Sequence, residues 1–358
     1  MTTQKQRLLS LDILRGITVA GMIMVNNGYM ESFEMLEHSE WNGMTPCDLV
    51  FPFFLFIMGI STYLSLSKYQ FQPTKKVIWK ILKRTVLLFL IGLAIHWFAH
   101  AIDGDFWCFP HLRIWAVLQR IALCYGIVSL FAIFVSHKWV VPAIVVLLAI
   151  YSAILILGNG YAQDGSNILA RVDIALFGSE HLYHKGPVDP EGLLGTISSV
   201  AHVLIGFYCG MRMKKADTVN QKVISFFFIG TILVFAGYLL SYGLPLNKRI
   251  WSPSYVLVTC GLASLLQGLL MVVIDVRGKK QWCTFFKVFG INPLFIYVAS
   301  EVLAILLGHI GVSNAVFSGI HAVIPAVKWA SLTYAVYFVL LNYILGYILY
   351  KRNIYIKL

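Results

Sequence analysis

Charged residues are scarce in this sequence. They make up 12% of its 358 residues, whereas 59% are hydrophobic and the mean hydropathy is +0.77. A soluble domain usually carries about 25% charged residues. This chain therefore has too little polar surface to cover a water-exposed globule, which excludes the ordinary soluble fold classes.

Metal-ligand motifs are also lacking. The six cysteines form no CxxC pair and show no Cys/His spacing of the kind that binds metal, so we expect no metal. Cys47 and Cys108 fall near the same face of the membrane and either pair or serve as small apolar fillers. A small-residue cleavage site is missing too, and Asp12 and Arg15 interrupt the first apolar stretch, so we expect that stretch to be retained rather than removed as a signal peptide.

Long apolar runs are what the sequence has instead. Four of them contain no charged residue: 139–157, 223–242, 254–274 and 329–350. Each is long enough to cross a membrane core of about 30 Å as a helix. Strands of a membrane barrel would alternate polar and apolar residues, and these runs do not. The sequence therefore predicts an all-α, polytopic helical membrane protein.

The apolar pattern predicts ten spans, with 311–326 as a short, Gly- and Ser-rich eleventh candidate. The ten expected spans are 8–30, 48–67, 77–98, 114–135, 139–157, 193–211, 223–242, 254–274, 285–308 and 329–350. Most of the 28 basic residues lie in the N-terminal segment and in every second loop, which predicts a cytoplasmic N-terminus. Orientation thus accounts for the net charge of +12, and these residues can also contact anionic membrane lipid. We expect no nucleic-acid partner.

The first span contains polar residues at both ends. LDILRG places Asp12 and Arg15 three residues apart on one helical face, where they form either an interfacial anchoring pair or part of a site. MVNNG places Asn26 and Asn27 near the outer end, where they either bond neighbouring helices or act on a ligand.

The segment EHSEWNGMTPCDLVF is the most polar stretch next to an apolar run. His38 lies in a short outer loop and Asp48 opens the second span. A carboxylate can fix the tautomer of an imidazole, so the pair is a candidate for an oriented base. The alternative is a solvated loop histidine flanked by Glu37 and Glu40.

Three further segments contain polar candidates. In RIWAVLQR, Arg113 and Arg120 lie a heptad apart at an outer end, where the distribution of basic residues does not require them. In the expected ninth span, Asn292 and Pro293 predict a broken helix that lines a cavity, and Glu301 is an acid inside the membrane. The long outer loop 158–192 contains an ordered turn region with polar groups for a ligand, made of Gly186, Pro187, Asp189, Pro190, Glu191 and Gly192.

These segments together resemble the heparan-α-glucosaminide N-acetyltransferase family. The resemblance rests on LDILRGITVAGMIMVNN, SEWNGMTPCDLVFPFFLFIMGIS, RIWAVLQR, EHLYHKGPVDPEGLLGT, NKRIWSPSYV and GINPLFIYVASEV, which follow in order through nearly the whole chain. It implies transfer of an acetyl group from cytosolic acetyl-CoA to the amino group of a glucosamine-type sugar across the membrane. It also implies one transmembrane acyltransferase domain, 1–358, with an outer catalytic loop at 31–47.

The resemblance also assigns residues to roles. His38, before Trp-Asn-Gly, matches the family's active histidine, and Asp48 and Asn26 match its aspartate and asparagine. In this interpretation His38 is the base or carries the acetyl group, Asp48 orients it, and Asn26 donates to the oxyanion. Ser300 stands where animal members have histidine, which leaves a second histidine role unsupported.

Binding residues follow from the same interpretation. We expect basic and polar side chains to bind the cofactor: Arg15, Asn27, Lys83, Arg84 and Arg120. We expect aromatic and polar side chains to bind the sugar: Trp41, Arg113, Trp251, Tyr255, Asn292 and Glu301. The aromatic residues among them equally suit a membrane-interface belt.

Location and partners complete the expectations. Animal members carry an additional lumenal domain before the first span, which we do not find, so the sequence predicts a prokaryotic member in a bacterial inner membrane with its site towards the periplasm. The resemblance favours a homodimer. A transporter or carrier of amino sugars or glycolipid precursors is the alternative function, with Glu301 and the Asn292–Pro293 break as its gate.

Overall fold

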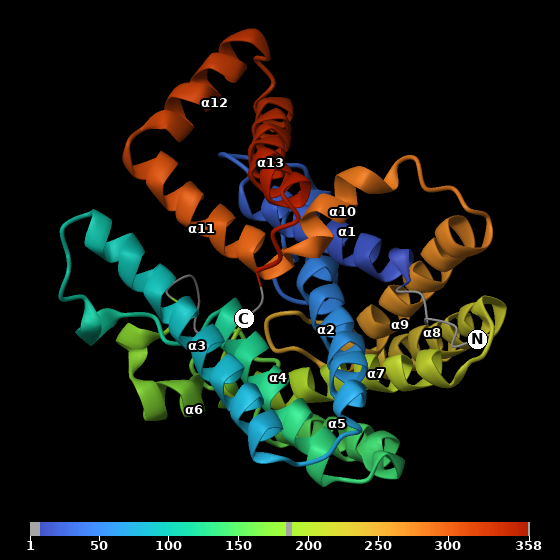
Figure 1. Ribbon diagram of the computed structural model, residues 1–358. Coiled ribbons are helices and arrows are strands. Elements are labelled where there is room, and N and C mark those ends of the chain that lie inside the picture. The colour runs from blue at the N-terminus through green and yellow to red at the C-terminus, as the bar shows by residue number, and fades with distance from the viewer. Residues whose placement is uncertain (1–7, 184–187, 357–358) are drawn as a thin grey trace.

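The computed structural model describes residues 8–183 and 188–356, and within these ranges it contains helices and no β-strand (Figure 1). The α-helices are α1 (Leu9–Asn26), α2 (Val50–Leu66), α3 (Lys75–Ile102), α4 (Val117–Phe134), α5 (Val140–Leu157), α6 (Ile168–Phe177), α7 (Gly195–Lys215), α8 (Val219–Ser241), α9 (Pro253–Leu270), α10 (Cys283–Ile291), α11 (Pro293–His309), α12 (Val312–Val323) and α13 (Val327–Lys351). The expected all-α class is confirmed, and the protein is a polytopic helical membrane protein.

The number of clear spans is smaller than the sequence predicts. Eight described helices are long and apolar enough to cross a membrane, or nine if the bent pair α10–α11 counts as one span. The remaining expected span, 193–211, corresponds to α7, which is 21 residues long but contains small and polar residues such as Ser198, Ser199 and His202. Most of α7 is buried against α2, α4, α5 and α9. Because protein rather than lipid surrounds α7, its surface has no need to be apolar.

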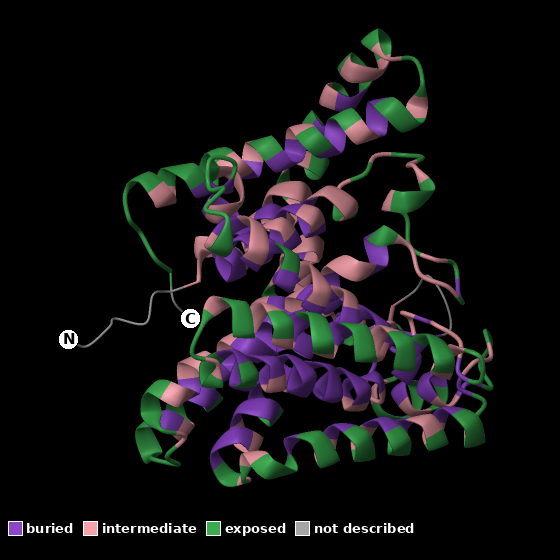
Figure 2. Cartoon of the chain, turned by 90° about the vertical axis from the view of Figure 1, so that its right-hand side faces the viewer, coloured by how far each residue is buried: buried purple, intermediate pink, exposed green. Residues whose placement is uncertain are grey.

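Burial separates central helices from peripheral ones (Figure 2). The central helices α1, α2, α4 and α9 bury most of their residues, whereas α3, α5 and α8 bury few. The peripheral helices expose large apolar side chains such as Val145, Ile156 and Phe228. In a soluble protein such a surface would aggregate, but in a bilayer it is the solvent-compatible face.

Glycine allows the closest helix contact in the core. Gly59 on α2 and Gly206 on α7 face the backbone of the opposite helix, so that a Cβ on Gly59 would collide with the Val203 carbonyl and one on Gly206 with the Phe56 carbonyl. Small residues at such crossings let helix backbones approach closely, which strengthens the van der Waals packing between helices in a membrane. The α2–α7 pair therefore forms a rigid centre for the site at the start of α2.

The predicted break at Asn292–Pro293 is confirmed. Helices α10 and α11 meet there at 84°. Proline at the first position of α11 lacks the N–H that would continue the α10 ladder. After the break α11, α12 and α13 extend from the bundle as an arm (Figure 1). The expected eleventh candidate, 311–326, contains α12, an apolar helix of 12 residues.

Hydrogen bonds between loops define one end of the bundle, which we call the loop end: 27–49, 103–116, 158–194 and 242–252, less the undescribed 184–187. Gly43 N donates to Leu246 O over 2.7 Å, and Ile114 N donates to His181 O over 3.1 Å. His309, at the end of α11, contacts Asp103 over 2.8 Å. The opposite end, which we call the basic end, contains the lysine-rich turns around 68–76, 212–222 and 277–287.

Candidate active site

The backbone around Thr45 holds the carboxylate of Asp48 in place. Thr45 caps a 3₁₀ turn, Pro46–Leu49, that leads into α2, and Pro46 suits its first position. Oδ2 of Asp48 accepts the backbone N–H groups of Thr45, at 3.0 Å, and Ser39, at 3.1 Å. Asp48 is fully buried. A buried carboxylate is costly unless it is paired and hydrogen-bonded, and here one oxygen is satisfied before any other side chain is considered.

The second oxygen of Asp48 binds His38. Oδ1 lies 2.8 Å from His38 Nδ1, and the His38 side chain is 49% exposed. With the proton on Nδ1 shared with the carboxylate, the lone pair on Nε2 is left to accept a proton from outside. The expected contact between the two residues is thus present. Their catalytic roles remain predictions.

Lys248 is the residue that the sequence interpretation missed. Its Nζ lies 2.9 Å from both ring nitrogens of His38 and 3.6 Å from Asp48 Oδ1. If Nζ lay in the plane of the imidazole at 2.9 Å from both nitrogens, it would collide with Cε1, the carbon between them. The ammonium must therefore lie over the face of the ring. It therefore leaves the in-plane lone pair of Nε2 open.

The environment of Lys248 has opposing effects on its charge. Burial lowers the pKa of Lys248 below the usual lysine value, and the carboxylates of Asp48 and Glu191 act against that shift. A lysine with this balance of effects is typical of functional sites. The sequence contains one signal for this residue, because NKRIWSPSYV places a lysine on the acid-rich side, in the same stretch as Trp251 and Tyr255.

Cys47 also contacts His38, with its Sγ 3.1 Å from Nδ1. The alternative that pairs Cys47 with Cys108 is wrong for this structure, because both thiols are free. Each is buried, as the apolar-filler alternative predicts.

The aromatic residues expected to stack on a sugar are buried in the protein around the site. Trp41 is buried, and its Nε1 donates to Tyr161 O over 3.0 Å. The Tyr255 hydroxyl donates to the backbone oxygen of Asp48 over 2.5 Å. The buried Trp251 ring packs edge-on against Phe51 and Tyr255. Tyr255 thus holds the Asp48 turn directly and Trp251 packs beside it, and the contact of all three rings with substrate stays a prediction.

Asn26 and Glu301 come together from distant parts of the sequence. Asn26 Nδ2 donates to Glu301 Oε1 over 3.2 Å, which joins the end of α1 to α11. Asn27 donates to Ile23 O over 2.8 Å within its own helix end. Among the described residues no hydrogen bond links this pair to His38, so the oxyanion role expected of Asn26 stays a prediction.

The two arginines of RIWAVLQR are separated in the structure. The sequence places both on one helix, but α4 begins only at Val117, so Arg113 lies in the preceding loop. Arg113 forms ion pairs with Asp189, at 3.0 Å, and Glu191, at 2.9 Å, in the long loop. The turn there includes Pro190 and Gly192, whereas the expected Gly186 and Pro187 lie outside the described residues.

Arg120 lies in the core. Its Nη2 donates to Gly192 O over 2.9 Å, and its guanidinium lies 5.2 Å from the centre of the Trp251 ring. Within the described structure its Nε and Nη1 have no hydrogen-bond partner. Arg120 thus holds the long loop at Gly192 and does not line the cavity described next.

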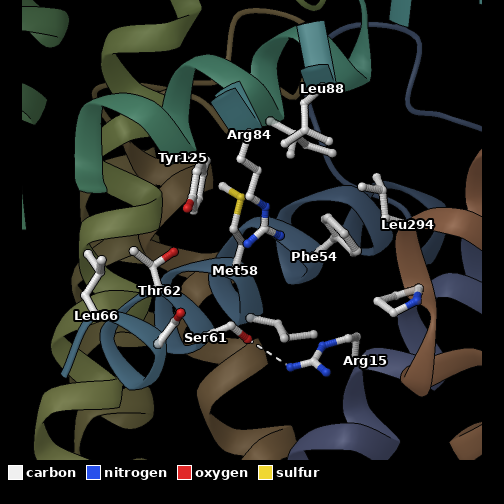
Figure 3. A pocket seen from close by; sticks show the side chains of 14 residues that line it. Arg15, Phe54, Met58, Ser61, Thr62, Leu66, Arg84, Leu88, Tyr125 and Leu294 are labelled. Carbon is white, nitrogen blue, oxygen red and sulfur yellow. Dashed lines mark hydrogen bonds between the residues drawn. The ribbon is translucent and has the colours of Figure 1, made fainter. Parts of the chain in front are cut away.

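Arg15 and Arg84 meet at a second place, a cavity of about 260 Å³ between α1, α2, α3 and α4 (Figure 3). Both guanidinium groups point into it, and Arg15 donates to Ser61 over 2.9 Å. Pro293, at the α10–α11 break, also lines the cavity, as the expectation of a cavity-lining break requires.

Arg84 is only partly satisfied by the protein. It lies 4.6 Å from the centre of the Tyr125 ring, and its Nε has no hydrogen-bond partner in the part of the chain that the structure describes. Lys83 and Asn292, two other expected binding residues, do not line this cavity. Lys83 is exposed. The Asn292 side chain donates from Nδ2 to Ile354 O over 2.8 Å and accepts at Oδ1 from Ile356 N over 2.9 Å.

Comparison with known proteins gives concordant results. A family model described as "Heparan-alpha-glucosaminide N-acetyltransferase, catalytic" matches residues 7–169, the part that contains Asn26, His38 and Asp48. The heparan-alpha-glucosaminide N-acetyltransferase of Mus musculus is 28% identical over 83% of this chain and 54% of its own length. That of Homo sapiens is 28% identical over 83% of this chain and 53% of its own length.

The chain thus spans about half the length of the curated relatives it matches. The match covers both the Asn26–Asp48 segment and most of the bundle that supports it. By these matches the chain is similar to the heparan-α-glucosaminide N-acetyltransferases, and its residues 7–169 match the catalytic model of that family.

Proposed function

We propose that the protein transfers an acetyl group from acetyl-CoA to the amino group of a glucosamine-type sugar. The observation that supports it most is the His38–Asp48 contact of 2.8 Å at a half-exposed imidazole. The similarity to known proteins supports the reaction class, because both relatives carry the name of an N-acetyltransferase.

The residues of the site suit the proton transfer in this reaction. Acetyl-CoA supplies a thioester carbonyl as the group that the amine attacks. His38 Nε2 accepts the proton that the amine loses as the C–N bond forms, and returns it to the thiolate as the C–S bond breaks. Asp48 holds the ring and balances the imidazolium charge in the interval.

Lys248 is positioned to stabilise the negative charge that develops on the carbonyl oxygen during attack by the amine. Its ammonium is fixed within 2.9 Å of the imidazole, so a carbonyl carbon attacked beside Nε2 brings its oxygen into the field of this charge. Asn26 remains a proposed additional donor. A preorganised cation needs no rearrangement during the reaction, and this is the condition for strong stabilisation.

The cavity of Arg15 and Arg84 fits the donor. Guanidinium groups bind phosphate through two parallel hydrogen bonds, and the partnerless Nε of Arg84 is a donor left for such a ligand. Ser61, beside Arg15, follows Asp48 by 13 residues, which at 1.5 Å per residue is roughly 20 Å along the helix axis. The flexible arm of the donor would extend through this distance from the basic end towards the loop end.

This separation supports a proposed sidedness for the two substrates. We propose that the phosphates bind near the cytoplasmic face and that the sugar meets His38 on the opposite face, in a bacterial inner membrane. A single domain, 1–358, is part of the proposal, since the described helices that build the His38 site and the cavity pack into one continuous bundle. The homodimer rests on the family resemblance alone.

A direct assay tests the reaction. Purified protein would be mixed with radiolabelled acetyl-CoA and glucosamine, and label would be followed into N-acetylglucosamine. We expect transfer by the wild type and a fall of about 10²–10⁴-fold in His38→Ala, the range for loss of a general base. His137→Ala, a histidine near the basic end, serves as the control and should keep its activity. Equal rates in all three proteins would remove His38 from the mechanism, and absence of transfer to any amino sugar would overturn the proposed acceptor.

A further inference from the structure

The turn after α3 gathers four potential metal ligands outside the His38 site. Nitrogen, oxygen and sulfur donor atoms of His100, Asp105 and Cys108 all lie within 4.8 Å of one another. His100 Nδ1 is 3.8 Å from Asp105 Oδ2, and the same oxygen lies 2.8 Å from His111 Nε2. It is the one such group of three or more found in the part of the chain that the structure describes.

The backbone holds this arrangement independently of the four side chains. Asp105 N donates to His100 O over 3.1 Å, and Trp97 Nε1 donates to Phe106 O over 3.2 Å, so the turn folds back on the end of α3. Gly104, with φ of +93°, permits the reversal. His111 N donates to Cys108 O over 3.0 Å.

We infer that His100, Asp105 and Cys108 bind a divalent zinc-like metal ion at this turn. Thiolate, imidazole and carboxylate together are donors that Zn²⁺ accepts, whereas Mg²⁺ and Ca²⁺ require oxygen donors throughout. Three protein ligands leave a fourth tetrahedral position for water. His111 acts as the hydrogen-bond partner that orients the ligating carboxylate.

The distances allow the site to close around an ion. Ligand bonds of about 2.0–2.3 Å at tetrahedral angles place donor atoms roughly 3.5 Å apart, so the present spacing must shrink by about 1 Å. His100 and Asp105 are 40% and 43% exposed and can rotate, while Cys108 is fully buried and supplies the fixed point. The His111–Asp105 pair alone would account for two of these residues, but not for a buried thiol beside a second histidine.

The ion would brace the loop end of the bundle. His111 precedes Arg113 by two residues, and the turn is tied to α11 through Asp103 and His309 at 2.8 Å. We expect the metal to fix the segment that leads to the Arg113–Glu191 ion pair, without taking part in acetyl transfer.

Metal titration of the full chain in detergent tests this inference. Tag-free protein would be stripped with chelator and titrated with Zn²⁺ and, separately, with Co²⁺, which reports a thiolate ligand through a charge-transfer absorption band. We expect one metal ion per chain and the thiolate band in the wild type. Cys108→Ser should lose the band, and His100→Ala should bind at least 10-fold more weakly. His111→Ala should keep the band with weaker binding, because it acts only through Asp105.

His309→Ala is the matched control, since this neighbouring histidine pairs with Asp103 and contributes no donor to the cluster. It should bind metal as the wild type does. Thermal unfolding of each variant without metal identifies variants that have misfolded. If Cys108→Ser misfolds, His100→Ala still tests the site, because His100 is 40% exposed and its replacement leaves the buried thiol in place. Absence of metal uptake by the wild type, or uptake with an unchanged thiolate band in Cys108→Ser, would overturn the inference.

Discussion

The position of Lys248 over the imidazole of His38 suggests how a neutral base and a fixed cation share one site. The in-plane lone pair of Nε2 stays open for the amine proton, because the ammonium approaches both ring nitrogens equally at 2.9 Å. Asp48 Oδ1 lies 2.8 Å from His38 Nδ1 and 3.6 Å from Lys248 Nζ, so the carboxylate charge acts on both groups. Proton transfer and charge stabilisation are then separate functions of two side chains.

The lowered pKa of Lys248 predicts an alkaline limit to activity. The ammonium is present below this pKa and is lost as pH rises through it, so acetyl transfer should fall at a lower pH than an ordinary lysine would give. Lys248→Ala should lower kcat by about 10²-fold. Lys248→Arg should keep the charge and extend activity to higher pH. A wild-type profile identical to that of Lys248→Arg would contradict this role.

Arg84 predicts an effect on donor binding alone. A charge-assisted hydrogen bond contributes about 1.5–3 kcal/mol, so Arg84→Ala should raise the KM for acetyl-CoA by roughly 10- to 100-fold with little change in kcat. Lys80→Ala, an exposed lysine one turn earlier on α3, is the control. Steady-state kinetics with varied acetyl-CoA distinguish the two, and a loss confined to kcat would place Arg84 outside the donor site.

The short helix α6 anchors the long outer loop through the buried carboxylate of Asp173. Oδ1 of Asp173 accepts the backbone N–H of Leu193 at 3.0 Å, just before α7, while Oδ2 has no hydrogen-bond partner among the described residues. Burial raises the pKa of Asp173 to about 6, and the nearby carboxylate of Asp189 adds to the effect. The contact thus fastens α6 to α7 at an electrostatic cost.

That cost predicts a pH dependence of stability. Between about pH 4 and pH 6 the folded protein retains a proton on Asp173 that the unfolded chain releases, so this residue's contribution to stability declines as pH rises through that window. The shift from 3.8 to about 6 corresponds to about 3 kcal/mol. Asp173→Asn should therefore unfold at a higher temperature than the wild type at pH 7.5, with a smaller difference at pH 5. An equal difference at both values would contradict this.

For the molecule as a whole, the helical class and most span positions could be predicted because apolar runs near 20 residues have one stable form in a membrane. The break at Asn292–Pro293 was predictable for the same kind of local reason. Helix α7 was not distinguishable from a lipid-facing span, since its surroundings come from α2, α4, α5 and α9, which are distant in sequence.

The contacts in the candidate site likewise divide into those that are local in sequence and those that are distant. His38 and Asp48 are ten residues apart, and local turn chemistry around Thr45 joins them. Lys248 reaches His38 from 210 residues away, and Glu301 reaches Asn26 from 275 residues away. Such contacts depend on the packing of the whole bundle, so no spacing rule predicts them. The burial of Trp251 and Tyr255 could not be predicted for the same reason.

The most direct test of the account is acetyl transfer across a sealed membrane. Protein would be reconstituted in vesicles in one orientation, with radiolabelled acetyl-CoA supplied at the basic end and glucosamine at the loop end, and then with both on the same side. The account predicts labelled N-acetylglucosamine only when donor and acceptor are on opposite sides, and about 10²–10⁴-fold slower labelling with His38→Ala. Transfer that requires both substrates on one side would contradict a transmembrane reaction between the arginine cavity and His38.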